Sequence, residues 1–180
     1  KKKKKNKILK IKKIKKIYIK NEFIITEKNL SKVKSTNLIS NYYFLQEEKE
    51  TKSLDWDINV INSYNLKYLE KYKNIDTVYL SPEISFEEIK NLKNQDMKLG
   101  LIVYGRIRLM YIEADIFDSE YLEIENDNKD LLFVRKNANK NIEIYTAVPI
   151  NILDKIEDLG KYRIDEVRLD FTFKTEKEIL

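Results

Sequence analysis

Polar side chains of the kinds that bind or activate a substrate follow several apolar runs of this sequence. Carboxylates can act as general acids or bases, and arginines bind carboxylate, phosphate or carbonyl oxygens through paired N–H groups. Asparagine, serine and tyrosine side chains supply further hydrogen bonds that hold a substrate in place. The catalytic candidates are Glu83 and Asp170, and the substrate-binding candidates are Asn59, Asn62, Ser81, Tyr104, Arg106 and Arg168.

The chain contains no cysteine and no histidine among its 180 residues. This excludes disulfides, thiolate nucleophiles and iron–sulfur ligation by the chain itself, and it removes the side chain that titrates near neutral pH. Catalysis would therefore rest on carboxylates, tyrosine, lysine, arginine or a partner. No cofactor is predicted and no metal ligand is assigned. Carboxylate oxygens suit a divalent ion such as Mg²⁺, Ca²⁺ or Mn²⁺, which leaves a divalent metal as an open alternative.

A regular series of elements positions these candidates. Asn62 or Ser63 is expected to cap one helix, and Pro149 to lie in the first turn of another. Ser85 and Glu88 form a capping box before a third helix. The apolar pattern predicts a charged loop at 46–54 and strands at 57–61, 77–80, 99–104, 142–148 and 167–171. The candidates then gather where these strands end, which is where parallel α/β folds bind ligands.

The alternation of apolar strands with short helices predicts a parallel sheet, either doubly wound or part of a (β/α)8 barrel. A full barrel usually needs about 250 residues, so we expect an α/β fold of TIM-barrel-like parallel βα units that form a partial or degenerate (β/α)8 barrel. Residues 21–180 are assigned to this domain. An inserted β segment at about 107–141 interrupts it, with a hairpin whose strands are 121–124 and 131–135.

Charge is distributed unevenly along the chain. Residues 1–20 carry twelve lysines and no acidic residue, which leaves 23 basic and 30 acidic residues in the rest, a net charge of −7. We interpret residues 1–20 as a Lys-rich N-terminal arm, which is either a solvated linker or a contact for RNA or another anionic surface. No apolar run is long enough to cross a membrane, and the start lacks the apolar core of a secretory signal. We therefore expect a cytoplasmic protein without a membrane partner.

The ordered series of motifs at the strand ends resembles the collagenase-like peptidases over about residues 55–175. The matching segments are DINVINSY at 57–64, LSPEIS at 80–85 followed by EEI at 87–89, VYGR at 103–106 with Leu109-Met110, and RLDFT at 168–172. The resemblance implies the later units of a TIM-barrel-like catalytic domain. It implies proteolysis, with a protein or peptide as the substrate.

The chain also departs from that family's pattern. Arg108 stands where the family has a proline before Leu-Met, and the cysteines that hold an iron–sulfur cluster in some members are missing. No iron–sulfur cluster is expected, and the segment could be inactive. Some members take part in RNA hydroxylation, so an RNA-binding component of such a system is one alternative. A non-catalytic structural half-barrel is another, completed by a second copy or by a missing N-terminal half.

Overall fold

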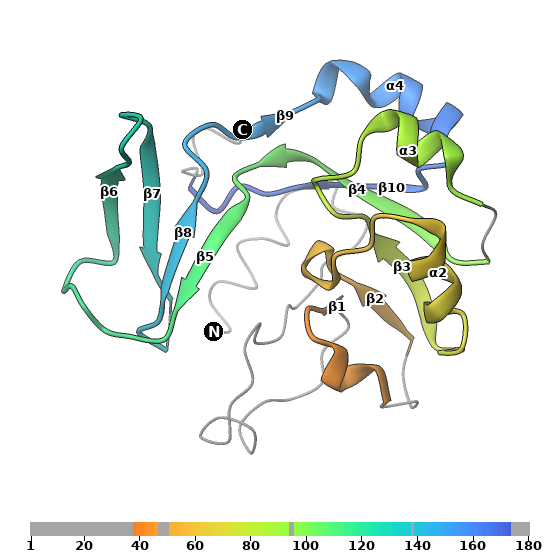
Figure 1. Cartoon of the computed structure of the whole chain (residues 1–180), viewed down its shortest axis with the longest axis horizontal. Coiled ribbons are helices and arrows are strands. Elements are labelled where there is room, and N and C mark those ends of the chain that lie inside the picture. The colour runs from red at the N-terminus through yellow and green to blue at the C-terminus, as the bar shows by residue number, and fades with distance from the viewer. Residues whose placement is uncertain (1–37, 47–50, 94–95, 138, 174–180) are drawn as a thin grey trace, which may run out of the picture.

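The computed structural model describes residues 38–46, 51–93, 96–137 and 139–173, which form two β-sheets (Figure 1). The larger sheet has the strand order β1-β2-β3-β4-β10, and all four neighbouring pairs are parallel. A short strand, β9, pairs antiparallel with the end of β4. The strands of this sheet are β1 (Leu38–Ile39), β2 (Lys52–Leu54), β3 (Ile75–Tyr79), β4 (Lys98–Gly105), β9 (Ile150–Asn151) and β10 (Glu166–Leu169).

Helices connect the parallel strands and lie on one side of the sheet in Figure 1. The Asn62 side chain accepts a hydrogen bond from Asn65 N–H at the start of α2, as expected of a cap. Ser85 and Glu88 form the expected capping box at the start of α3. The helical segments are η2 (Tyr42–Gln46), η3 (Trp56–Ile58), α2 (Ser63–Leu69), α3 (Phe86–Asn91), η4 (Leu153–Lys155), α4 (Ile156–Leu159) and η5 (Gly160–Tyr162).

The core lies between the parallel sheet and these helices. Side chains alternate across a strand, and in β4 every second residue, Leu99, Leu101 and Val103, belongs to one buried apolar cluster with Leu66 and Ile89 of the helices. The opposite face of the sheet is more polar. There Tyr79 donates a hydrogen bond from its hydroxyl to the Glu166 carboxylate at 3.0 Å. The sheet therefore has one apolar face and one face that carries hydrogen-bonding side chains.

The smaller sheet is antiparallel, with the order β5-β8-β7-β6. Its β6 and β7 form the hairpin expected in the inserted segment, closed by the turn in which Asn126 N–H donates to the Asp130 carbonyl at 3.0 Å. The segment extends further than expected, because β8 also joins this sheet. Its strands are β5 (Arg108–Ile112), β6 (Tyr121–Glu125), β7 (Leu131–Lys136) and β8 (Ile142–Tyr145).

The sequence-based fold class is confirmed at the coarser level of a mixed α/β protein with a parallel sheet. The parallel strands follow one another in chain order, as they would in a βα barrel, but the described residues form an open sheet and no closed barrel. No helix in the described part of the chain is long and apolar enough to span a membrane. The Lys-rich arm at 1–20 lies outside the described residues.

Three local predictions were wrong. The strand expected at 57–61 is a 3-10 helix and a turn, because the buried Asp55 carboxylate accepts the Trp56 N–H and starts η3 there. The strand instead lies within the stretch expected to be a charged loop, where Lys52 is buried and its Nζ donates to the Phe44 carbonyl at 2.7 Å. Pro149 does not begin a helix, since β9 follows it directly.

Candidate site at the carboxyl ends of the strands

A pocket of about 300 Å³ opens at the carboxyl ends of β2 and β3, beside the first residues of β5. It is lined by Trp56, Asp57, Asn59, Ser81, Pro82, Glu83, Ile107, Arg108, Leu109, Met110 and Tyr111. This volume is at the small end of the range for ligand pockets. The lining combines carboxylates, an arginine and an amide with aromatic and aliphatic side chains, the mixture typical of a site that binds an organic ligand.

Local backbone structure sets the pocket wall after β2. Asp55 N–H donates to the Ile39 carbonyl at 2.7 Å, so the residue is held to β1 while its carboxylate starts η3. The short helix then carries Trp56 to the pocket. Asn59 ends η3 in the left-handed region with φ of 58°, a conformation that asparagine tolerates better than most residues. This turn leaves the Asn59 side chain at the pocket and exposed.

The wall after β3 is a tight turn built around Ser81. Ser81 N–H donates to the Val60 carbonyl at 2.9 Å, which joins this wall to the one after β2. The Ser81 hydroxyl is buried and accepts the Glu83 N–H at 3.4 Å. The turn presents Glu83 as an exposed carboxylate at the pocket. Ser81 therefore shapes the turn that positions Glu83.

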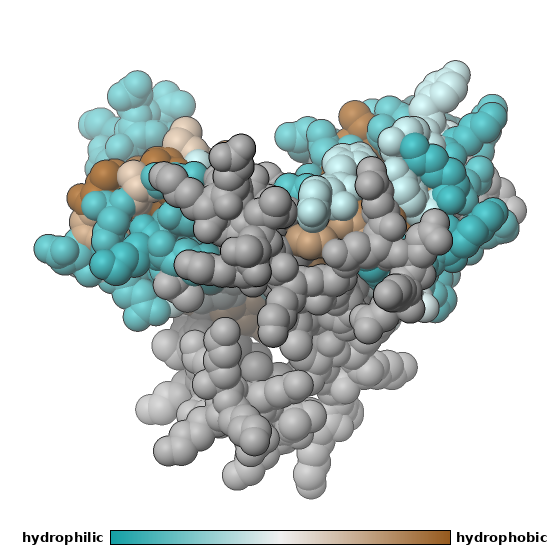
Figure 2. Space-filling model, turned by 90° about the horizontal axis from the view of Figure 1, so that it is seen from below, coloured by the Kyte–Doolittle hydropathy of each residue, from teal (hydrophilic) through white to brown (hydrophobic). Residues whose placement is uncertain are grey.

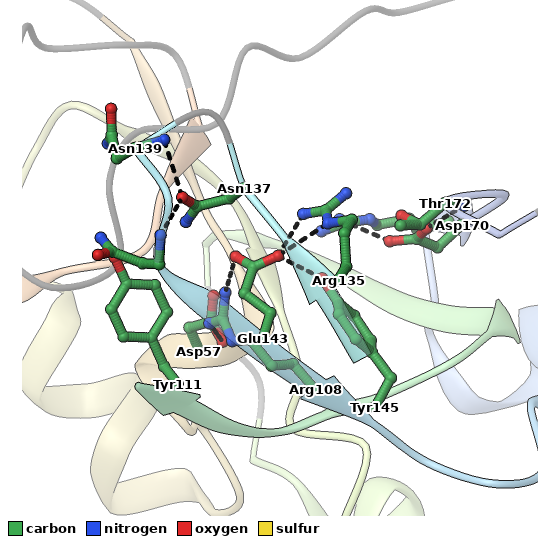
Figure 3. Close-up of polar contacts among 12 residues, drawn as sticks. Asp57, Arg108, Tyr111, Arg135, Asn137, Asn139, Glu143, Tyr145, Asp170 and Thr172 are labelled. Atoms are coloured by element: carbon green, nitrogen blue, oxygen red, sulfur yellow. Dashed lines mark hydrogen bonds and ion pairs between the residues drawn. The ribbon is translucent and has the colours of Figure 1, made fainter. Parts of the chain in front are cut away.

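A buried ion pair forms the third wall. Arg108 Nη2 donates to Asp57 Oδ1 at 2.7 Å, and the two side chains are only 8% and 2% exposed (Figure 3). Removing two charges from water costs free energy, and a buried pair offsets this cost only when its geometry is good and further hydrogen bonds are present. The pair links the larger sheet, through η3, to the first residue of β5 in the smaller sheet.

The network continues from Arg108 to Glu143 of β8, whose Oε1 lies 3.6 Å from Arg108 Nη1 (Figure 3). Arg135 also binds the Glu143 carboxylate, and the Tyr145 hydroxyl donates to it at 2.9 Å. Burial alone would raise the pKa of Glu143, but the charge and hydrogen bonds of Arg135, the hydrogen bond from Tyr145 and the charge of Arg108 lower it overall. Burial raises the pKa of Tyr145, so its hydroxyl stays protonated.

The second catalytic candidate, Asp170, lies in a different cluster. Its carboxylate accepts hydrogen bonds from Thr172 N–H at 2.9 Å and from Arg168 Nη2 at 3.4 Å. Arg168 also pairs with the fully buried Asp55. Neither Asp170 nor Arg168 lines the pocket. Arg168 holds β10 to the turn after β2, and the backbone N–H of Asp170 donates to the Tyr104 carbonyl at 2.8 Å.

Three further candidates have structural partners. Asn62 caps α2, and the Tyr104 ring packs against that of Phe171 at a tilt of 42°, with ring centroids 5.5 Å apart. The Arg106 guanidinium donates to the carbonyl groups of residues 146 and 147 and lies over the ring of Phe133. These three side chains do not line the pocket.

The structure thus brings together Asn59, Ser81 and Glu83 out of the eight candidates. Sequence reasoning missed Trp56, Asp57 and Arg108. Asp57 was taken as the start of a strand, and Arg108 was noticed only as a departure from a motif. The signal available for Arg108 was an arginine between the apolar residues Ile107 and Leu109. Its partner could not be identified, because the two residues are 51 positions apart.

No group of three acidic side chains in the described ranges is arranged to hold a metal ion. Comparisons with protein families, with curated proteins and with solved structures found no match to this chain.

Proposed function

We propose that this chain is a peptidase of the collagenase-like type, built as a partial βα barrel, and that its carboxyl-end pocket binds a segment of a protein substrate. One observation carries the proposal. Asn59, Ser81 and Glu83, which come from two of the motifs that resemble that family, line the same pocket although they follow different strands. The apolar lining residues beside them suit the side chains of a peptide, and the polar ones suit its amide groups.

Glu83 is the residue proposed to act on water. Its exposed carboxylate would take a proton from a water molecule as the water oxygen bonds to the scissile carbonyl carbon. The same proton would then pass to the leaving amine nitrogen as the C–N bond breaks. The exposed Asn59 amide would donate a hydrogen bond to the carbonyl oxygen as negative charge develops on it.

Release of labelled peptides from gelatin and casein by the full chain tests this assignment. Glu83→Gln keeps the size of the side chain but removes the base, so it should lower the rate about 100-fold or more, since a general base usually contributes a factor of about 10²–10⁴. Glu87→Gln is the matched control, because Glu87 is an exposed acid of α3 that does not line the pocket. Equal rates for wild type and Glu83→Gln, or no hydrolysis by wild type, would contradict the proposal.

A further inference from the structure

The strand β6 ends the smaller sheet, and within the described part of the chain it pairs with β7 alone. Lys136 N–H donates to the Glu120 carbonyl at 2.8 Å, and Asn126 N–H donates to the Asp130 carbonyl at 3.0 Å. Hydrogen-bonded positions alternate along an antiparallel pair. The backbone N–H and C=O groups of the even-numbered residues in this stretch therefore point toward β7. The N–H and C=O groups of Tyr121, Glu123 and Glu125 point to the outer edge of the sheet.

A hollow of about 610 Å³ lies beside this edge, lined by Tyr121, Leu122, Glu123, Phe133, Val134, Thr172 and Phe173. Its floor is aromatic, since Phe173 contacts the rings of Phe133 and Tyr121 at centroid distances of 5.6 and 6.0 Å. Tyr121 is 51% exposed and Leu122 is 42% exposed. On the lobe of the smaller sheet, at the left in Figure 2, apolar surface lies among hydrophilic side chains.

The sequence segment that contains β6 is strongly acidic. Residues 113–130 contain eight acidic side chains and a single basic one, Lys129. Glu120, Glu123 and Glu125 on and beside β6 are all exposed. Charged side chains on an edge strand discourage indiscriminate pairing with other strands. Pairing of β6 with β6 of a second copy would set glutamates against glutamates, and like charges across a strand pair are destabilising.

We propose that the outer edge of β6 and the adjoining hollow bind an extended basic segment of a partner protein. The segment adds as a further strand through the outward N–H and C=O groups of β6. Glu123 and Phe133 are cross-strand partners, so the glutamates and the aromatic floor of the hollow lie on the same face of the sheet. The lysine or arginine side chains of the segment lie on this face, with their charged ends at the glutamates and their aliphatic stems over the hollow, and its apolar side chains lie beside Leu122 on the other face. This inference stands apart from the proposed peptidase activity, because neither the edge nor the hollow shares a lining residue with the carboxyl-end pocket.

Fluorescence anisotropy of a labelled peptide of alternating Lys and Val residues, titrated with the full chain, tests the charge requirement. The basic peptide should bind at least tenfold more tightly than the same peptide with Glu in place of Lys. Glu123→Lys should weaken binding of the basic peptide at least tenfold. Glu87→Lys makes the same charge change on α3 and should leave binding unaltered. Equal binding of the two peptides, or equal losses in the two variants, would overturn the proposal.

Two further measurements test strand addition. The N–H of Glu123 points away from β7, so Glu123→Pro should leave the hairpin folded while it removes an outward donor and abolishes peptide binding. In the wild-type chain, hydrogen exchange at Tyr121, Glu123 and Glu125 should slow by at least tenfold when the basic peptide is bound. Unchanged exchange at these amides would show that the peptide does not add as a strand, whatever the stability of the variant.

Discussion

Arg108 and Asp57 form a buried ion pair with a hydrogen bond of 2.7 Å, and this pair ties the first residue of β5 to the turn after β2. It is the point at which the two sheets meet at the wall of the carboxyl-end pocket. The same arginine lies 3.6 Å from Glu143, so the pair also connects to the buried polar network of the smaller sheet. The position of β5 therefore depends on charges as well as on backbone pairing.

Breaking this pair should be costly. Asp57→Asn removes the carboxylate that binds the buried Arg108 at 2.7 Å, and we expect the free energy of unfolding to fall by about 3 kcal/mol, the low end for a broken buried pair. Urea unfolding measures the loss. Asp158→Asn is the control, because its pair with Lys161 leaves the two side chains 56% and 75% exposed. Equal urea midpoints for Asp57→Asn and wild type would contradict the assigned role.

Glu143 should make stability depend on pH in the acidic range. Although burial alone would raise its pKa, its arginine and tyrosine partners lower the pKa in the folded state below the ordinary value of 4.5. Because its pKa is lowered in the folded state, ionised Glu143 stabilises that state above about pH 4.5. This contribution is lost as the pH falls through the folded-state pKa. Urea midpoints at pH 6 and pH 3.5 should therefore differ less for Glu143→Gln than for wild type. If the urea midpoints of Glu143→Gln and wild type differ by the same amount between the two pH values, other groups cause the acid sensitivity.

Gly105 allows β4 and β10 to approach closely where β4 ends. Its φ is +137°, and an added Cβ would lie 2.6 Å from Asp170 Cβ and 2.9 Å from the Asp170 carbonyl oxygen. Gly105→Ala should lower the free energy of unfolding by about 2 kcal/mol or more, from backbone strain and steric overlap. Gly160→Ala is the opposite case, since Gly160 has helical φ and open space around it, and it should raise stability by about 0.5 kcal/mol. Thermal unfolding of the two variants should shift in opposite directions.

The capping box of α3 should contribute to stability through local hydrogen bonds. Ser85 Oγ accepts the Glu88 N–H at 3.2 Å, and the Glu88 carboxylate accepts the Ser85 N–H at 2.8 Å. Ser85→Ala should lower the free energy of unfolding by about 1 kcal/mol, as is usual for the loss of a cap. Ser119→Ala, at an exposed position outside the helices and strands, is the matched control. If the two alanine variants unfold at the same urea concentration, the cap does not contribute as assigned.

Local signals predicted those parts of the fold that depend on neighbouring residues. The caps at Asn62 and Ser85 and the β6–β7 hairpin were correct, because each is set by side chains or a turn within a few positions. The strand at 52–54 was missed because its Lys52 and Ser53 are buried despite their polarity. Their burial is offset by partners distant in sequence, such as the Phe44 carbonyl for Lys52, which a local pattern does not reveal.

The candidate site was predictable in part for the same reason. Asn59, Ser81 and Glu83 follow strands of a parallel sheet, and the sequence places them at the edge where parallel α/β folds bind ligands. Arg106 and Arg168 were equally plausible by residue type. Only the tertiary structure assigns them to the carbonyl groups of residues 146 and 147 and to Asp55.

By itself the sequence determined the alternation of strands and helices, the absence of thiol and imidazole chemistry, and the presence of polar residues directly after several strands. These follow from side-chain type and short-range periodicity. The tertiary structure alone decided the open order of the parallel sheet, the Asp57–Arg108 pair and the outward edge of β6. Each depends on tertiary contacts between segments that are distant in sequence. Charged and polar residues are buried only where such contacts supply hydrogen-bond or ion-pair partners.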